Sequence, residues 1–433
     1  MLKTIAIGIL SWILVLPLSL NAQAENKYPL LDSLKQVLDA NNKVKGSYCI
    51  YAKGKVVAEG SFGGPHGPWK YRVGSISKTF TAMLMLLAED EGKINLDDTL
   101  SSWFPSIKNA DRISLRMLLN HSSGIHNFTN DASFGQIMQT KQSRSAMIAR
   151  FAAMESDFEP GTDFGYSNTN FVLASYILED LYQKSIGDLL LEKLNPLAEI
   201  EGTYFFEENK KSESEVSSYF YTNDWVEMPA THPSIPLGAG GIVSSPLELC
   251  KFMRSIHVGN TTSEENKTRI QAIENYDFGI MTFPFFDKQA FGHNGGIDGF
   301  QSHASYFPQE DLAIAICLNG SQYPLNDLSL DLLSIYFGKA DYKLPEFKNI
   351  SLSEAELRPF IGLYKSDNFP LDISIEVKEG ELFGQASGQP SFPLSATDKN
   401  VFEFKAAGIR MEFMPEDNIM NFEQGGAKIQ FKR

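Results

Sequence analysis

Ser75-Ile76-Ser77-Lys78 is the only S-x-x-K sequence in this chain, and it stands where a loop enters a long helix predicted over residues 75–91. Residues three apart share one helix face, so the Lys78 amine points toward the Ser75 hydroxyl. A serine hydroxyl is a weak nucleophile until a base takes its proton, and a lysine desolvated by packing can have a pKa low enough to act as that base. The pattern predicts a nucleophile, although an N-cap serine followed by a surface lysine gives the same letters.

A tyrosine and an asparagine form the second candidate element. Tyr166-Ser167-Asn168 lies between a Pro-Gly turn and a helix predicted over residues 170–184, where a phenol and an amide can project into a cleft. Tyr221-Thr222-Asn223 repeats the Y-x-N pattern, but it follows a polar run and is predicted to be a surface loop. The first of the two is therefore the better candidate.

A glycine-rich strand forms the third candidate element. Gly292-His293-Asn294-Gly295-Gly296 begins or lies on a late strand, and its glycines let a substrate approach the backbone closely. A single histidine in such a strand is more often structural. The order and spacing of the three elements favour a site.

Strand patterns at both ends of the first 340 residues enclose a helical middle. Residues 46–61 form two strands joined at Lys53-Gly54, and the helix of residues 75–91 is expected to bury one face. Later strands are predicted over residues 291–296, 300–307 and 312–318. This order indicates an α+β fold, in which an antiparallel sheet closed by its termini packs against a helical cluster.

The chain divides into three predicted segments. Residues 1–24 resemble a signal peptide, with Lys3, an apolar run and an A-x-A cleavage signature. A membrane anchor is the alternative, but the run is shorter than the about 20 apolar residues that a span needs. Residues 25–345 are the predicted main domain, and residues 351–433 alternate short apolar runs with turns, as in a small all-β barrel or sandwich. The mature protein is expected to be exported, either periplasmic or secreted.

Composition excludes several kinds of partner. Acidic residues outnumber basic ones by 53 to 38, so the surface repels phosphate backbones and a nucleic-acid partner is not expected. The seven histidines occur singly, which predicts no metal site and no cofactor, and His121 and His126 are interpreted as structural. The three cysteines, Cys49, Cys250 and Cys317, are predicted to be buried core residues, and an odd count cannot pair completely.

The three elements together resemble the serine β-lactamase and penicillin-binding protein superfamily, in particular its class C-like branch of esterases, D-amino-acid peptidases and carboxypeptidases. The resemblance spans roughly residues 30 to 340 and includes the stretches 101–105, 113–124 and 240–246. Residues 360–364, Phe-Ile-Gly-Leu-Tyr, resemble the start of the lipocalin-like C-terminal domain of some members. The resemblance implies a β-lactamase/transpeptidase-like fold.

The resemblance also implies roles for the candidate residues. Ser75 would be the nucleophile, with Lys78 and Tyr166 as its acid and base partners. The substrate-binding residues would be Asn168, His293, Gly295 and Gly296. His293 stands where the β-lactamases of this superfamily carry lysine, and a histidine is mostly neutral at pH 7, so recognition of a penicillin carboxylate should be weaker.

The predicted function is an exported serine hydrolase that cleaves an ester or amide through an acyl-enzyme on Ser75. The substrate is a small molecule or peptide: a short ester, a D-amino-acid peptide or a β-lactam-like compound. Two alternatives stay open, a penicillin-binding sensor that is acylated without turnover and a non-catalytic ligand-binding protein. The choice of substrate, the principal base and the oligomeric state are not determined by the sequence.

Overall fold

The computed structural model describes residues 28–207, 212–222, 224–347, 350, 352–366, 369, 371–389, 391–404, 407–424 and 427–433. The predicted signal peptide and Asn223 lie outside these ranges. None of the helices within them is long and apolar enough to cross a membrane.

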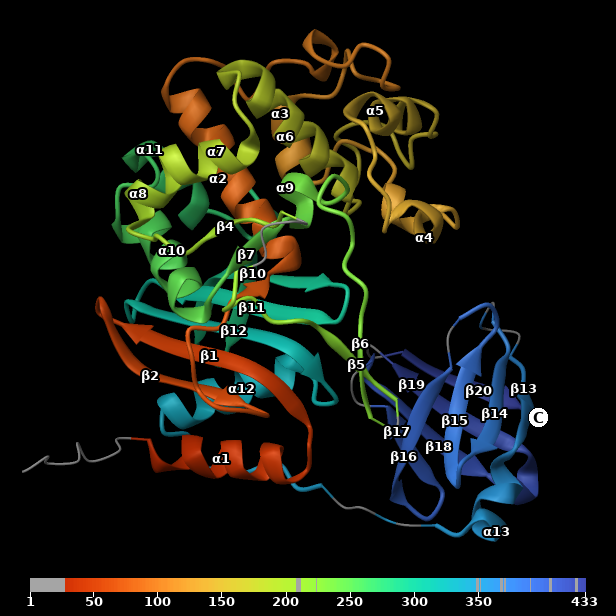
Figure 1. Ribbon diagram of the computed structural model, residues 1–433. Coiled ribbons are helices and arrows are strands. Elements are labelled where there is room, and N and C mark those ends of the chain that lie inside the picture. Colours follow the sequence, from red (N-terminus) through yellow and green to blue (C-terminus); the bar gives the residue numbers. More distant parts are fainter. Residues whose placement is uncertain are drawn as a thin grey trace, which may run out of the picture.

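A seven-stranded antiparallel sheet organises the larger part of the chain, in the order β2-β1-β12-β11-β10-β9-β8 (Figure 1). Its strands are β1 (Val44–Ala52), β2 (Lys55–Phe62), β8 (Tyr276–Asp277), β9 (Ile280–Phe285), β10 (Lys288–Ile297), β11 (Phe300–Phe307) and β12 (Leu312–Ser321). β1 pairs with β12 along its whole length, with Cys49 opposite Ala315. The prediction of one sheet closed by its first and last strands is therefore confirmed.

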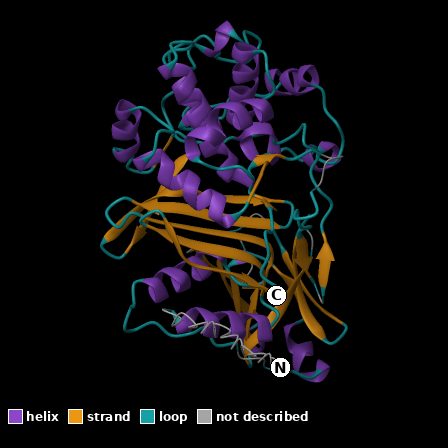
Figure 2. Cartoon of the chain, turned by 60° about the vertical axis from the view of Figure 1, so that its left-hand side comes forward, coloured by secondary structure: helices purple, strands orange, loops and turns teal. Residues whose placement is uncertain are grey.

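Helices cover both faces of this sheet (Figure 2). α1 (Pro29–Ala40) and α12 (Leu325–Tyr336) lie on one face. The cluster on the other face comprises α2 (Ser77–Asp90), α3 (Leu115–Leu119), α4 (Phe134–Ile137), α5 (Arg144–Ala152), α6 (Asn168–Tyr182), α7 (Ile186–Leu189), α8 (Asn195–Ala198), α9 (Leu237–Gly240), α10 (Pro246–Val258) and α11 (Glu264–Gln271). Alternate residues of β12 enter two separate cores: Cys317 packs in the core of the larger cluster, and Ile316 in the core under α1 and α12.

The helix α2 is buried on almost every side, so the expectation of a single buried face is wrong. It runs through the middle of the helical cluster, with α6 and α9 packed against it. Its polar residues are satisfied inside the protein: the Thr79 hydroxyl donates to the Gly279 carbonyl at 2.6 Å, and the Thr81 hydroxyl donates to the Gly238 carbonyl at 2.9 Å. Hydrogen bonds of this kind are invisible to a pattern of apolar residues.

Two small sheets complete the larger part of the chain. One contains β3 (Tyr71–Arg72), β7 (Ile242–Ser244) and β4 (Tyr204–Phe205), and the other is the hairpin of β5 (Tyr219–Tyr221) and β6 (Trp225–Glu227). The prediction of a surface loop at Tyr221 is wrong, because the aromatic run from Tyr219 pairs with Trp225–Glu227 as a strand. This hairpin extends toward the C-terminal domain (Figure 1), where the Phe220 ring lies 6.2 Å from the Phe404 ring.

The C-terminal domain is an eight-stranded antiparallel sheet that nearly closes into a barrel. Its strands follow in chain order: β13 (Gly362–Tyr364), β14 (Ile373–Lys378), β15 (Glu381–Ala386), β16 (Phe392–Asp398), β17 (Val401–Phe404), β18 (Ile409–Met414), β19 (Ile419–Gln424) and β20 (Ala427–Lys432). Lys365 and Lys432 exchange two backbone hydrogen bonds of 2.8 Å, which join the first and last strands. The short helix α13 (Glu354–Leu357) precedes the sheet. An all-β C-terminal domain was the prediction, and the structure confirms it.

All three cysteines are buried and free, as expected of core residues. Cys250 lies against strand β1, with its sulfur 3.5 Å from the Cys49 carbonyl oxygen. They therefore act as packing groups in this structure.

Candidate active site

Ser75 lies in the middle of a 3₁₀ turn, η1 (Gly74–Ile76), between β3 and α2. Gly74 has a φ of +52°, and a Cβ atom there would lie 2.7 Å from the Gly296 nitrogen. A Cβ atom on Gly295 would lie 2.0 Å from the Val73 carbonyl oxygen. Because both positions are glycine, the turn that carries Ser75 packs directly on the backbone of β10. The structure thus brings Ser75, Gly295 and Gly296 together.

Lys78 is completely buried one helical turn after Ser75. Its Nζ lies 3.0 Å from Ser75 Oγ, and it donates to Asn168 Oδ1 and to the Ala239 carbonyl, both at 2.7 Å. Burial holds the pKa of the Lys78 amine well below its usual value. A neutral amine has two hydrogens and one lone pair, so the two acceptors occupy the hydrogens and the lone pair is left for the serine hydroxyl.

Tyr166 comes from the loop before α6 and reaches the same serine. A side-chain hydrogen bond joins its phenol to the Ser75 hydroxyl, and burial raises the pKa of the phenol. Lys78 Nζ lies 4.8 Å from the centre of the Tyr166 ring. The phenol therefore keeps its proton at neutral pH, while the amine beside it is readily deprotonated.

Asn168 is the first residue of α6, and its amide orientation is fixed on both sides. Its Nδ2 donates to Thr129 Oγ1 at 3.0 Å, which turns Oδ1 toward Lys78. Its backbone N–H donates to Asn127 Oδ1 at 3.0 Å. These bonds hold the helix start against the loop of residues 126–130.

His293 is buried on β10 with both ring nitrogens in contact with protein atoms. Nδ1 meets the carbonyl oxygen of Asn294, and Nε2 lies 3.3 Å from the Tyr276 hydroxyl. A carbonyl oxygen can only accept, so Nδ1 carries the proton and Nε2 accepts from Tyr276. Burial and the nearby Lys78 lower the pKa of His293 to about 3, which makes the ring neutral at pH 7.

Three contributors to the site had not been identified from the sequence. Tyr276 starts the short edge strand β8, Asn127 lies in the loop of residues 126–130, and Ala239 contributes only its backbone carbonyl. A carbonyl oxygen exists at every position, so no side-chain signal could have indicated Ala239. Tyr276 lies 17 residues from His293 and Asn127 lies 41 residues from Asn168, and neither belongs to a motif that would have indicated it.

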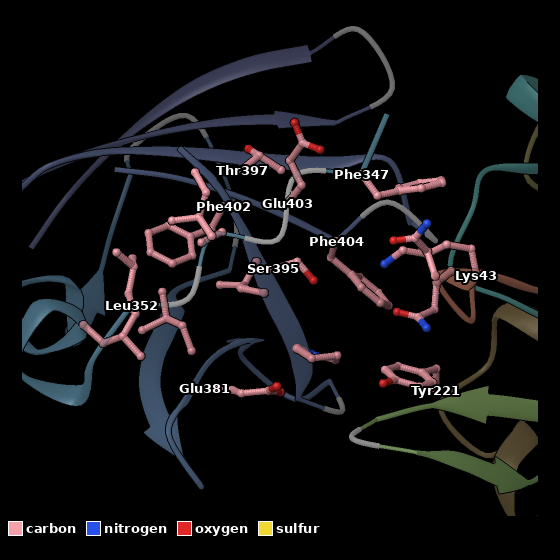
Figure 3. Close-up of a pocket in the computed structure, with 18 of the residues that line it drawn as sticks. Lys43, Tyr221, Phe347, Leu352, Glu381, Ser395, Thr397, Phe402, Glu403 and Phe404 are labelled. Atoms are coloured by element: carbon pink, nitrogen blue, oxygen red, sulfur yellow. The ribbon is translucent and has the colours of Figure 1, made fainter. Parts of the chain in front are cut away.

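The second Y-x-N sequence lies elsewhere. Tyr221 lines a cavity of about 590 Å³ between the hairpin and the C-terminal domain, together with Lys43 and Phe404 (Figure 3). Its ring packs edge-on against Trp225, with the ring centres 5.1 Å apart. The structure therefore separates this tyrosine from Ser75.

No group of three or more His, Cys, Asp or Glu residues is arranged to hold a metal ion in the part of the chain that the structure describes.

Comparison with known proteins shows the family of the chain. The sequence model of the family described as Beta-lactamase matches residues 32–333. The teichoic acid D-alanine hydrolase of Staphylococcus aureus strain MRSA252 is 21% identical over 316 residues, covering 68% of this chain and 75% of that protein. The chain belongs to the Beta-lactamase family, and with it to the serine hydrolases.

Solved structures extend the likeness. A D-stereospecific amidohydrolase from Streptomyces sp. has a TM-score of 0.61 and 26% identity, over 67% of this chain and 94% of that chain. The octameric penicillin-binding protein homologue from Pyrococcus abyssi has a TM-score of 0.64 and 22% identity, over 93% of this chain and 99% of that chain. The second match includes most of the C-terminal domain as well as the hydrolase part.

Proposed function

We propose that this protein is an exported serine hydrolase that releases D-amino acids from esters or amides through an acyl-enzyme on Ser75. The observation that carries the proposal is the contact of Ser75 Oγ with both the buried Lys78 amine, at 3.0 Å, and the Tyr166 phenol. Burial lowers the pKa of Lys78 and raises that of Tyr166. These opposite shifts favour the lysine as the base and the tyrosine as the proton donor.

Acylation begins when Lys78 Nζ takes the proton of Ser75 Oγ. The oxygen attacks the substrate carbonyl, and the backbone N–H groups of Ser75 and Gly296 stabilise the oxyanion that forms. The carbon to leaving-group bond then breaks, and Tyr166 supplies the proton that the departing alcohol or amine needs. The proton on Lys78 returns to Tyr166, so the pair is again neutral.

Deacylation repeats the sequence with water. Lys78 takes a proton from the water, the hydroxide oxygen attacks the acyl carbon, and the same two N–H groups hold the oxyanion. The ester bond to Ser75 breaks, and the serine oxygen regains a proton through the Tyr166 phenol. The products are a free carboxylic acid and the enzyme in its starting state.

Asn168, His293, Gly295 and Gly296 are assigned to substrate binding. Gly296 presents open backbone beside the turn that carries Ser75, and Gly295 packs on the Val73 carbonyl, which keeps the strand close to that turn. Asn168 fixes the lysine as well as a substrate amide. His293 is neutral and hydrogen-bonded on both sides. The strand therefore offers no full positive charge at this position to a substrate carboxylate, which favours substrates that lack one there.

The substrate class comes from the relatives' names. The curated relative is a teichoic acid D-alanine hydrolase, and the solved structures include a D-stereospecific amidohydrolase and a D-amino acid amidase from Ochrobactrum anthropi. A D-amino-acid ester or amide is the chemistry they share. We also propose that the enzyme acts on such compounds outside the cell, after residues 1–24 have been removed. Its two domains would be residues 25–345 and 351–433.

A paired-enantiomer assay tests this function. D-alanine and L-alanine p-nitroanilides are compared with a chromogenic cephalosporin, and the D form should be preferred by at least about tenfold. Ser75→Ala should abolish turnover and labelling by a fluorophosphonate, whereas Ser395→Ala, in the cavity of Figure 3, should leave both unchanged. Persistent labelling of Ser75→Ala would exclude this nucleophile. The intact mass of the protein after exposure to substrate separates the alternatives: a stable adduct indicates a sensor, no adduct and no product indicate a binding protein, and product release indicates turnover.

A further inference from the structure

His121 holds the loop that carries Tyr166 from both sides of the tyrosine. Its backbone carbonyl accepts the N–H of Gly165 at 2.9 Å, and its ring Nδ1 accepts the N–H of Ser167 at 3.2 Å. Its ring centre lies 4.4 Å from that of Tyr166. One residue therefore fixes the backbone before and after the tyrosine and also packs on its side chain.

The tautomer of His121 follows from its partners. Nδ1 also meets Asn170 Nδ2 at 3.2 Å, and that amide is oriented because Asn170 Oδ1 accepts from the Ser123 hydroxyl at 2.8 Å. Nδ1 therefore accepts two hydrogen bonds and carries no proton, so the proton lies on Nε2. Burial, together with Lys78 and His293, lowers the pKa of His121 well below its usual value, and the ring stays neutral.

The conformation and burial of His121 destabilise the folded state more than a side chain that only fills space would. His121 has a left-handed φ of +60°, and its completely buried Nε2 has no hydrogen-bond partner among the described residues. An unpaired buried N–H and a left-handed backbone each destabilise the folded state, and an apolar side chain would avoid the first cost. The acceptor at Nδ1 is what an apolar side chain cannot supply.

We infer that His121 is a positioning residue of the reaction, which holds the Tyr166 phenol on Ser75. The inference rests on the proposed function, because it requires Tyr166 to carry a proton during turnover. His121 touches no reacting atom in this arrangement. It acts through the backbone of residues 165 and 167 and through the ring of Tyr166.

Two substitutions that tolerate the left-handed backbone test the inference. His121→Gly removes the ring acceptor, and His121→Asn keeps an oxygen acceptor near the place of Nδ1. His121→Gly should lower kcat by about 10²-fold with KM changed by less than about threefold, because a misplaced catalytic group costs rate more than binding. His121→Asn should restore kcat to within about tenfold of the unmodified enzyme. The matched control is His257→Asn, which removes another buried histidine packed on a tyrosine, at 4.9 Å from Tyr306, and should leave kcat unchanged.

A double-mutant cycle separates this inference from the proposed function. In a Tyr166→Phe background, His121→Gly should lower kcat by less than about threefold further, since the group it positions is already gone. The same loss in both backgrounds, or full kcat in His121→Gly, would overturn the positioning role. Full activity of Tyr166→Phe alone would instead overturn the proposed function. If thermal melting shows that His121→Gly is unfolded, His121→Asn decides: a loss as large as that of Tyr166→Phe contradicts the inference.

Discussion

Tyr166 and Tyr221 stand in the same three-letter pattern, yet they occupy opposite kinds of surroundings. The half-buried Tyr166 phenol lies against Ser75 and Lys78, and its loop is anchored by His121. Tyr221 ends a two-stranded hairpin and lines the cavity beside the C-terminal domain (Figure 3). Each tyrosine has a lysine nearby, Lys78 in the first region and Lys43 in the second.

The difference lies in burial and in what the lysine contacts. Lys78 is completely buried and bonded to two oxygen acceptors besides Ser75. Lys43 is half-buried, and its Nζ lies 5.3 Å from the centre of the Phe347 ring. A tyrosine and a lysine therefore become a proton-transfer pair only where the fold removes water and supplies acceptors for the amine hydrogens.

The largest effect is expected from the two lysines. Lys78→Met removes the proposed base and should lower kcat/KM by at least about 10³-fold, whereas Lys43→Met should change it by less than about twofold. Steady-state kinetics on a D-alanine p-nitroanilide measures both. Equal losses of kcat/KM in the two variants would contradict the claim that only the buried lysine takes part in the reaction.

The two tyrosines give the next largest effect. Tyr166→Phe removes one hydroxyl from the hydrogen bond to Ser75 and should lower kcat by about 10²-fold, while Tyr221→Phe should be close to the unmodified enzyme. Circular dichroism checks that both variants are folded. A larger loss in Tyr221→Phe would mean that the hairpin, and not the α6 loop, supplies the catalytic tyrosine.

Acid should destabilise the buried region through its histidines. Burial lowers the pKa of His293 to about 3 and the pKa values of His257 and His303 to about 4, against about 6.5 in the unfolded chain. The unfolded state binds more protons below pH 6.5, so stability falls as the pH drops from about 6.5 to about 4. The melting temperature should decrease by at least about 3 °C between pH 7 and pH 5. A constant melting temperature over this range contradicts the neutral, buried state of these rings.

The smallest effect is expected at the contact between the hairpin and the C-terminal domain. Phe220→Ala removes the ring packed against Phe404 and should cost about 1 kcal/mol of that contact, with kcat unchanged. Calorimetry measures the unfolding transition, and Phe286→Ala, which removes a phenylalanine that is 68% exposed, serves as the control. A fall in kcat would show that the hairpin region acts on the Ser75 site after all.

Much of the fold could be predicted because it follows from local patterns. The turn at Lys53-Gly54 within residues 46–61 and the apolar run of residues 312–318 predicted strands that pair in the structure, and the unique S-x-x-K placed Ser75 and Lys78 one helical turn apart. The full burial of α2 could not be predicted, since Thr79 and Thr81 satisfy their hydroxyls with carbonyls about 200 and 160 residues away in the chain.

The sequence by itself determined the family, the α+β order of elements and the candidate residues Ser75, Lys78 and Tyr166. These depend on residue type and short spacing, which are written in the chain. Only the tertiary structure decided which Y-x-N tyrosine meets Ser75, that Ala239 accepts from Lys78, and that His121 holds the Tyr166 loop. Contacts of this kind join residues far apart in sequence. They depend on backbone groups, which every residue carries, and on burial, which the residue type alone does not specify.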